Sequence, residues 1–287
     1  MRLISYRSIT LLIAFILVLS ASYGQSEKKH KAGSIYFSWG YNKEWYTNST
    51  VHVKQDKDGN YYKLMNVEAH DHPGWDERGG IFAKQLTIPQ YNYRLGYYFN
   101  EKQDLAIELN FDHTKYIIAD GQTVRLKGTF NHRPTDSNIV FTAANGCYYY
   151  LNNGANFFLV NIVKRWSLYK SQQLPLRLEF MGKFGIGPVM PHVENSFFGQ
   201  RNEPHFQLGG WNTGLETAIR ATITKYAYLE FAQKVDYARY SNLKILNGTA
   251  KQSFGTYELI LSIGVTVPTT KNNPMFLRRN ASAESAQ

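Results

Sequence analysis

The sequence contains only one cysteine, Cys147, so an internal disulfide is impossible. Beyond residue 24 it contains no run of 18 apolar residues, which excludes a helical membrane span in that region. The mean hydropathy is negative, at −0.40. A chain of this length without disulfides must be held together by burial or by a closed hydrogen-bond network. Membrane-spanning strands stay compatible with these absences, because only every second residue of such a strand faces lipid.

Alternation of apolar and polar residues is the main feature that the sequence does contain. In residues 104–112, Leu105, Ile107, Leu109 and Phe111 are apolar, and the positions between them are small or polar. Successive side chains of a strand point to opposite faces, so this segment predicts a strand with one apolar face. The same pattern predicts eight strands, at 34–46, 88–99, 104–118, 154–166, 176–186, 208–223, 227–240 and 255–267.

The connections between these strands alternate in length. The short connections are 100–103, 167–174 and 224–226, and the long ones are 47–87, 119–153, 187–207 and 241–254. This alternation is typical of an up-and-down barrel with tight periplasmic turns and long outer loops. Ten strands result if Tyr61–Ala69 and Gln122–Phe130 also belong to the barrel, and this count stays open as the alternative.

Residues 1–24 have the composition of a secretory signal peptide. Arg2 and Arg7 form a basic region before the apolar run Ile9–Leu19, and small residues precede Gln25. A retained N-terminal anchor is the alternative. In an exported chain we expect the apolar faces to meet lipid and the polar faces to line a lumen.

We therefore predict an all-β fold, an antiparallel up-and-down transmembrane β-barrel over residues 34–267. A flexible lead at 25–33 precedes the barrel, and a polar C-terminal tail at 268–287 follows it. The alternative is a secreted β-sandwich whose polar rows face water.

The polar faces of the predicted strands carry acids and bases in nearly equal number. An eight-stranded barrel has an interior that side chains can just fill, so these charges should pair with one another. The pattern predicts a salt-bridged lumen rather than a pore. Its charge network consists of Arg94, Glu108, Asp112, Arg165, Arg177, Glu179, Lys183, Glu216, Arg220, Glu230, Lys234, Asp236 and Glu258.

Candidates for catalysis and metal binding are few. His113 follows Asp112, but alternation directs the two side chains to opposite faces, so they cannot pair within a regular strand. His70 and His72 flank Asp71 without a further ligand at a defined spacing. Ser196 lacks the G-x-S-x-G context of a nucleophile elbow. We therefore expect no cofactor and no metal, and His113 is the one candidate for a general base.

Lys and Arg outnumber Asp and Glu by 32 to 22, which gives a net charge of +10, or +8 without the two Arg of the predicted signal. An exported basic chain rarely meets nucleic acid, so the expected partners are the lipid bilayer and lipopolysaccharide. Arg125, Lys127 and Arg133 are candidates for contact with lipopolysaccharide phosphates. The predicted loops 47–87 and 119–153 are candidates for binding an extracellular ligand. We expect a monomer.

The chain resembles Gram-negative outer-membrane β-barrel proteins of the small OmpA/OmpX-type plan. The resemblance rests on the signal peptide, the repeated alternation, and the segments 88–99 and 112–116, the latter followed by 121–124. One departure is that the last predicted strand ends at Val267 rather than on an aromatic residue. The resemblance implies an outer-membrane location and a non-enzymatic role in the envelope or in surface interaction. The alternatives are a lipid A-modifying hydrolase or acyltransferase with His113 as base, and a small-solute channel.

Overall fold

The computed structural model describes residues 33–74, 90–100 and 102–269. The predicted signal peptide, most of the flexible lead and nearly all of the polar tail lie outside these residues. Within them the chain is almost entirely β-structure, with two short 3-10 helices, η1 (Asp56–Asp58) and η3 (Ala143–Asn145). No helix in this part of the chain is long and apolar enough to cross a membrane.

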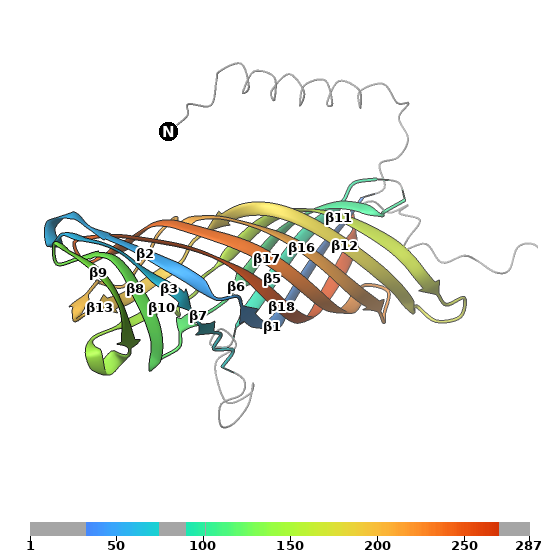
Figure 1. Cartoon of the computed structure of the whole chain (residues 1–287). Coiled ribbons are helices and arrows are strands. Elements are labelled where there is room, and N and C mark those ends of the chain that lie inside the picture. The colour runs from blue at the N-terminus through green and yellow to red at the C-terminus, as the bar shows by residue number, and fades with distance from the viewer. Residues whose placement is uncertain (1–32, 75–89, 101, 270–287) are drawn as a thin grey trace, which may run out of the picture.

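Eight antiparallel strands form a closed ring, which can be followed in Figure 1. Each strand pairs with the next one in the ring. The ring closes because the first strand pairs with the second on one side and with the last on the other. The prediction of an eight-stranded up-and-down barrel is therefore confirmed. Its strands are β1 (Ser34–Tyr46), β5 (Tyr91–Tyr98), β6 (Leu105–His113), β11 (Phe157–Lys170), β12 (Arg177–Val189), β16 (Gly210–Thr222), β17 (Ala227–Ile245) and β18 (Gly248–Pro268).

The long connections were predicted as loops, and this prediction is wrong for their described residues, most of which lie in strands; residues 75–87 of the predicted loop 47–87, and the first two residues of the predicted strand 88–99, lie outside the described residues. The described segments form a second β-structure at one end of the barrel, which we call the cap (residues 47–74, 114–156, 190–209 and 241–254; Figure 1). The segment 241–254 is a continuation of β17 and β18 as a hairpin. The other cap strands are β2 (Ser49–Gln55), β3 (Asn60–Val67), β4 (Ala69–His70), β7 (Tyr116–Ile118), β8 (Gln122–Phe130), β9 (Arg133–Phe141), β10 (Tyr148–Leu151), β13 (His192–Phe197), β14 (Gln200–Arg201) and β15 (His205–Phe206).

The ten-strand alternative is also wrong, although both extra segments are strands. β3 and β8 pair with each other, and β2 joins them to the far end of β18. They extend the sheet beyond the barrel instead of entering the ring. The predicted strand 104–118 is likewise divided, since β6 ends at His113 and β7 begins at Tyr116 within the cap.

The cap has an apolar core, and that is the physical reason why its segments are ordered. Alternate residues of β2, β3 and β8, such as Val51, Leu64 and Leu126, are buried in this core. The core also contains residues from the barrel strands, including Phe157 of β11 and Tyr240 of β17. The apolar core of the cap therefore continues into the wall of the barrel and lies over one end of the lumen.

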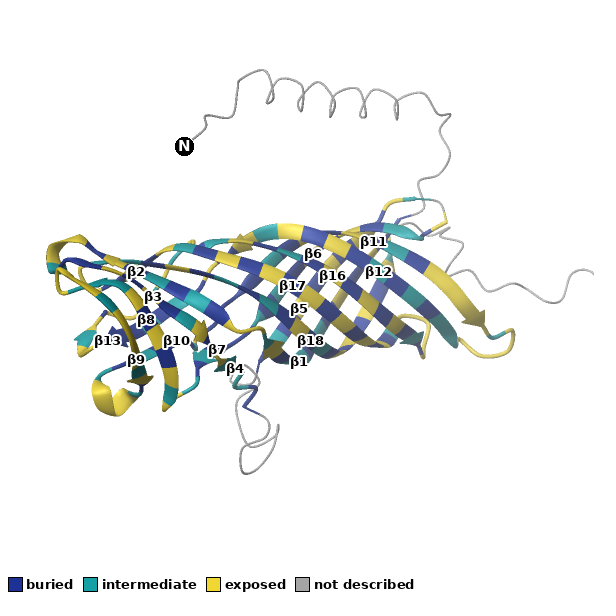
Figure 2. Cartoon of the chain, viewed as in Figure 1, coloured by how far each residue is buried: buried dark blue, intermediate teal, exposed yellow. Residues whose placement is uncertain are grey.

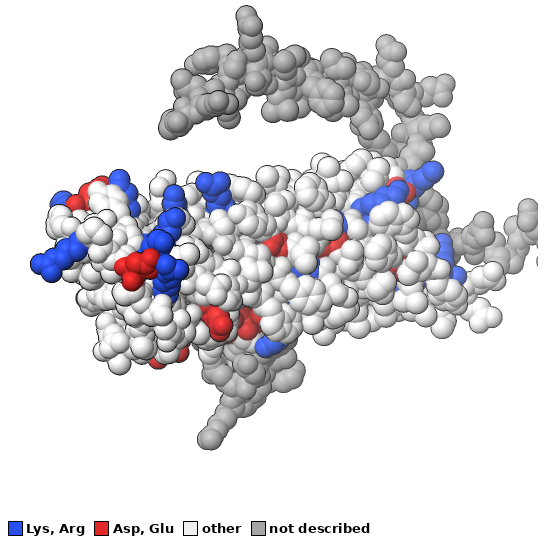
Figure 3. All heavy atoms as spheres, viewed as in Figure 1, with Lys and Arg blue, Asp and Glu red and all other residues white. Residues whose placement is uncertain are grey.

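The barrel wall has the opposite arrangement to a soluble protein. Buried and exposed residues alternate along every strand (Figure 2), and the exposed ones are mostly apolar. In the space-filling view the middle of the wall is largely free of charge (Figure 3). Exposed aliphatic side chains occupy the middle of the wall, among them Leu95, Leu109, Ile162, Leu215 and Leu261. Exposed aromatic side chains lie toward both ends, among them Trp45, Trp211, Tyr237 and Tyr257 near the cap and Tyr97, Phe99, Trp166 and Tyr226 near the short turns.

Such a wall matches a bilayer, in which an apolar band is flanked by aromatic side chains at the two interfaces. A soluble β-sandwich would bury these rows between two sheets. Leu109 is 56% exposed and Ile162 is 65% exposed, so the sandwich alternative does not describe this chain.

Candidate functional site

The lumen is filled by charged side chains that pair across it. Lys183 of β12 lies at its centre and is buried. The Nζ atom lies 3.2 Å from Glu108, 2.7 Å from Glu216 and 2.8 Å from Glu230. These carboxylates come from β6, β16 and β17, so this single ammonium group ties four strands of the ring together.

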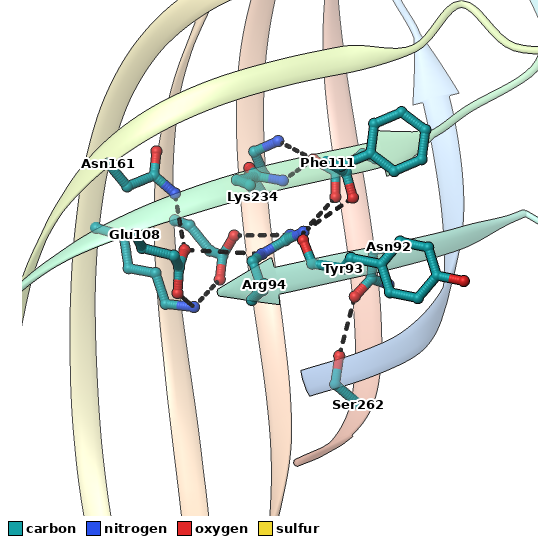
Figure 4. A network of polar contacts seen from close by, with 12 residues as sticks. Asn92, Tyr93, Arg94, Glu108, Phe111, Asn161, Lys234 and Ser262 are labelled. Atoms are coloured by element: carbon teal, nitrogen blue, oxygen red, sulfur yellow. Dashed lines mark hydrogen bonds and ion pairs between the residues drawn. The ribbon is translucent and has the colours of Figure 1, made fainter. Parts of the chain in front are cut away.

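Arg94 of β5 is the second branching point of the network (Figure 4). Its guanidinium lies 2.6 Å from Asp112, 3.2 Å from Glu216 and 3.8 Å from Glu108. The ammonium group of Lys234 also pairs with Asp112, at 2.5 Å. Every charged group named here is buried. Pairing of this kind is required, because an unpaired charge in such a place costs several kcal/mol.

Toward the short turns the network passes through aromatic rings. Arg220 bridges to Glu230 at 2.6 Å and lies over the ring of Tyr228, 3.9 Å from its centroid. Tyr98 lies between Arg220 and Arg165: its hydroxyl accepts a hydrogen bond from the former, and the latter lies over its ring at 4.2 Å. The charged guanidinium groups and the tyrosine rings together fill this half of the lumen.

Arg165 completes this end of the network through Glu179, 3.3 Å away. Arg177 is the exception among the predicted network residues, because it is only half-buried, beside the turn that joins β11 to β12. All the other predicted network residues are buried.

Toward the cap the network gains an acid that the sequence analysis missed. Glu44 of β1 is buried and lies directly across from Glu258 of β18. The side-chain amide of Asn42 donates to both, at 3.3 Å and 2.6 Å, and Tyr46 donates to Glu44. Glu44 adds an eighth acid to the seven predicted, against six bases. Glu44 has the same parity along β1 as the inward-facing Asn42, and that parity was the signal that could have found it.

Two close approaches show how tightly the lumen is packed. A Cβ atom added to Gly264 would lie 2.3 Å from the ring of Tyr228, and one added to Gly96 would lie 2.1 Å from the ring of Tyr36. The hydroxyl of Tyr36 also donates to Glu108 at 2.7 Å. Glycine at both positions makes room for an inward tyrosine, so neighbouring strands share the space without a channel between them.

The catalytic candidate His113 lies at the rim where the barrel meets the cap. Its ring stacks on Tyr91, with centroids 4.7 Å apart. Nδ1 lies 2.9 Å from Oδ1 of Asn156, whose amide donates to the carbonyl of Met190. Asp112 points into the lumen instead, as the alternation predicts. Among the described residues, no hydroxyl group or carboxylate hydrogen-bonds to His113.

The remaining sequence candidates lie in the cap. Nδ1 of His70 contacts the carbonyl of Asp71, whose carboxylate accepts from the backbone N–H of Glu44 at 2.8 Å. Ser196 donates to the carbonyl of Gly146 at 2.8 Å. In the described ranges, no three His, Cys, Asp or Glu side chains are grouped to hold a metal ion.

No protein-family model matches the sequence, and no curated protein matches it significantly. Among solved structures, OprG from Pseudomonas aeruginosa is 13% identical, with 84% of this chain and 99% of OprG covered at a TM-score of 0.43. Ail of Yersinia pestis, in complex with the heparin analogue sucrose octasulfate, is 14% identical over 82% of this chain and 99% of Ail, at 0.32. The outer membrane protease OmpT from Escherichia coli is 10% identical over 85% of this chain and 99% of OmpT, at 0.36.

The assignment of the fold rests on the pairing and burial of this chain itself. The ring of eight strands is closed, its wall is apolar, and its interior is charged. The chain is therefore an eight-stranded β-barrel of the small outer-membrane type.

Proposed function

We propose that the protein is a non-enzymatic, integral outer-membrane barrel with a closed lumen, and that the cap acts at the cell surface as its interaction module. The observation that carries this proposal is the continuous network in the lumen. It runs from Glu179 near the short turns, through Lys183 and Arg94, to Glu44 beneath the cap. A solute would have to break several buried ion pairs to pass.

The structure of the cap supports both parts of the proposal, the closed lumen and the interaction surface. Its apolar core lies over the end of the lumen and includes stacked aromatic rings, such as Tyr116 and Phe254 at 4.4 Å between centroids. An apolar layer above a salt-bridged interior opposes the passage of ions and of water. Order in the cap also suits recognition, because a preformed surface binds with a smaller loss of conformational entropy than a flexible loop.

His113 receives a positioning role in this proposal. It stacks on Tyr91 and holds Asn156, which in turn contacts Met190 of the neighbouring connection. It thereby ties three segments together where the barrel meets the cap. Mass spectrometry of lipid A from cells that carry the wild type or His113→Ala tests this role. We expect identical acylation in both, and a change would favour the lipid A-modifying alternative.

Planar-bilayer recording tests the closed lumen directly. Mature protein is inserted into the bilayer, and a porin with a known open lumen is the positive control at the same protein-to-lipid ratio. Insertion is verified on the same preparation by heat-modifiable migration on gels. We expect no steady current from the folded protein. A reproducible unitary conductance would contradict the proposal and favour the small-solute channel.

A further inference from the structure

The outer face of the cap carries a row of basic side chains that the barrel alone does not explain. Lys251 of β18 lies directly across from His52 of β2, His52 across from Lys63 of β3, and Lys63 across from Lys127 of β8. Adjacent strands are about 4.8 Å apart, so the four side chains line about 14 Å of the sheet. We call these four residues the basic row.

Like charges placed directly across from one another destabilise a sheet. In the barrel the register mostly avoids them, and the exceptions are Glu44 opposite Glu258 and, beside a turn, Lys170 opposite Arg177. Lys234 lies opposite Glu216 on one side and Glu258 on the other, and Arg220 lies opposite Glu179 and Glu230. Opposed charges in the lumen are thus mostly of opposite sign, whereas in the basic row Lys63 lies opposite Lys127 and only His52 lies between Lys63 and Lys251. The stability of the cap gains nothing from this arrangement, which indicates a partner that supplies the negative charge.

Two members of the basic row are available to such a partner. In the described part of the chain, neither Lys63 nor Lys251 forms an ion pair, and both are exposed. Lys127 has one acidic neighbour, Asp136, at 3.4 Å, and that carboxylate is shared with Arg125 at 2.6 Å. Acids on this face therefore neutralise only part of its charge.

The basic row borders a groove of about 730 Å³. Tyr61 and Lys54 add an aromatic ring and a further ammonium group to its lining. The ammonium group of Lys54 is 3.1 Å from Asp56. The groove is large enough for more than one phosphate group together with the sugar that carries them. In Figure 3 basic side chains lie on the cap and at the opposite end of the barrel, while the wall between them is mostly uncharged.

The position of this face limits the kind of partner. Lys251 has the same parity along β18 as Tyr257 and Leu261, so all three point to the outside of the sheet. Lys251 lies six residues beyond Tyr257, which corresponds to about 20 Å along the strand. The basic row thus faces sideways, about 20 Å along the strand from the aromatic edge of the apolar wall. A glycolipid whose phosphorylated sugars extend from the same leaflet reaches this face while its acyl chains stay in the membrane.

The geometry points to a binding site on the basic row and its groove for the phosphate groups of a phosphorylated glycolipid in the leaflet on the cap side. This inference rests on the proposed function, in which the cap lies at the outer surface of the membrane. Lys63, Lys127 and Lys251 would bind the phosphates as point charges, and Tyr61 would pack against the sugar. His52, between two lysines, would contribute a neutral hydrogen bond or a further positive charge.

Binding of lipopolysaccharide to the mature protein in uncharged detergent micelles tests the site. The complexes are quantified by native mass spectrometry, with intact and enzymatically dephosphorylated lipopolysaccharide as the two probes. The test variant is Lys63→Gln/Lys251→Gln. The matched control is Lys57→Gln/Arg201→Gln, which removes the same charge from exposed positions of the cap that do not line the groove.

We expect the intact probe to bind and the dephosphorylated probe to bind much more weakly. The test variant should weaken binding of the intact probe by about 25-fold, at roughly fivefold for each lysine removed, and the control by about twofold or less. Equal losses in the two variants, or undiminished binding of the dephosphorylated probe, would overturn the proposal.

A third probe, inorganic polyphosphate, separates the membrane source from a soluble one. If it binds as tightly as the intact lipid and depends on Lys63 and Lys251 in the same way, the partner is a soluble polyanion and the lipid assignment fails. All variants are also tested for heat-modifiable migration and for conductance. A variant that stays folded and closed while binding is unaffected refutes this site but leaves the proposed function standing.

Discussion

Replacement of Lys183 by methionine should destabilise the barrel more than any change to a surface charge. The side chain is buried, and its ammonium group is the shared partner of Glu108, Glu216 and Glu230, at 3.2, 2.7 and 2.8 Å. Methionine fills a similar volume but removes the positive charge. Loss of one partner from a buried ion pair costs about 3–5 kcal/mol, because the remaining charge stays buried without compensation.

The matched comparison is Arg125→Met. This residue pairs with Asp136 at a similar distance, 2.6 Å, but the two side chains are 51% and 43% exposed. An exposed pair contributes about 0–1 kcal/mol. The free energy of unfolding is measured by urea titration in lipid vesicles, with gel mobility of unheated samples as a second readout. The expected difference between the two variants is therefore about 2–5 kcal/mol.

A double variant isolates the electrostatic cause. Lys183→Met/Glu216→Met removes one charge of each sign, so the net charge of the lumen is unchanged. Glu230 keeps Arg220 as a partner, and Glu108 keeps Arg94 and the hydroxyl of Tyr36. The double variant should recover a large part of the lost stability. The reasoning is refuted if Lys183→Met is no less stable than Arg125→Met, or if the double variant is less stable than Lys183→Met.

Three further predictions concern packing, the cap and protonation. Gly264→Ala should lower stability by about 1–3 kcal/mol through overpacking against Tyr228, whereas the outward-facing Gly182→Ala should have a small effect in the same unfolding assay. Cys147 is buried and its thiol has a raised pKa because of that burial; maleimide labelling should therefore wait for the cap to unfold, and fast labelling of folded protein would contradict the buried cap core. Burial, followed by the two flanking lysines, lowers the pKa of His52 below its ordinary value. Folding thus favours its neutral form, so His52 contributes stability that is present above about pH 6.5 and is lost as the pH falls below that value. NMR titration should show this low pKa and a rise when phosphorylated lipid binds, and an ordinary pKa without the ligand would be the contrary result.

The barrel could be predicted from sequence because alternation along a strand fixes both its conformation and the side that meets lipid. Leu109 and Phe111 in β6 illustrate this, and they lie opposite the outward-facing Val160 and Phe158 of β11. The cap was missed for a physical reason. Its strands are short and interrupted by polar turns, so Val51 and Val53 alternate with polar residues over only a few positions. Their order comes from packing against distant segments, which periodicity within one segment does not report.

The charges in the lumen could also be identified by parity, but their partners could not. Which carboxylate meets Lys183 depends on the stagger between strands and on depth along the barrel axis. Glu230, for example, forms an ion pair with Lys183 although β12 and β17 are not neighbours in the ring. The positions of the inward tyrosines could not be predicted either, since Tyr228 fits only because Gly264 of the neighbouring strand leaves space for its ring.

The most direct test of whether the apolar rows face hydrocarbon is to measure lipid contact at methyl groups of residues that are neighbours in sequence but point to opposite faces of the wall. In nanodiscs with protonated acyl chains and an otherwise deuterated protein, nuclear Overhauser effects are measured for two neighbouring pairs. Ile162 and Leu261 are 65% and 60% exposed, whereas their sequence neighbours Val163 and Ile260 are 0% and 3% exposed. We predict strong acyl-chain cross-peaks for the first two and none for the second two. Water cross-peaks in place of lipid at Ile162 and Leu261, or equal lipid contact for all four residues, would contradict a barrel that turns its apolar side to the membrane.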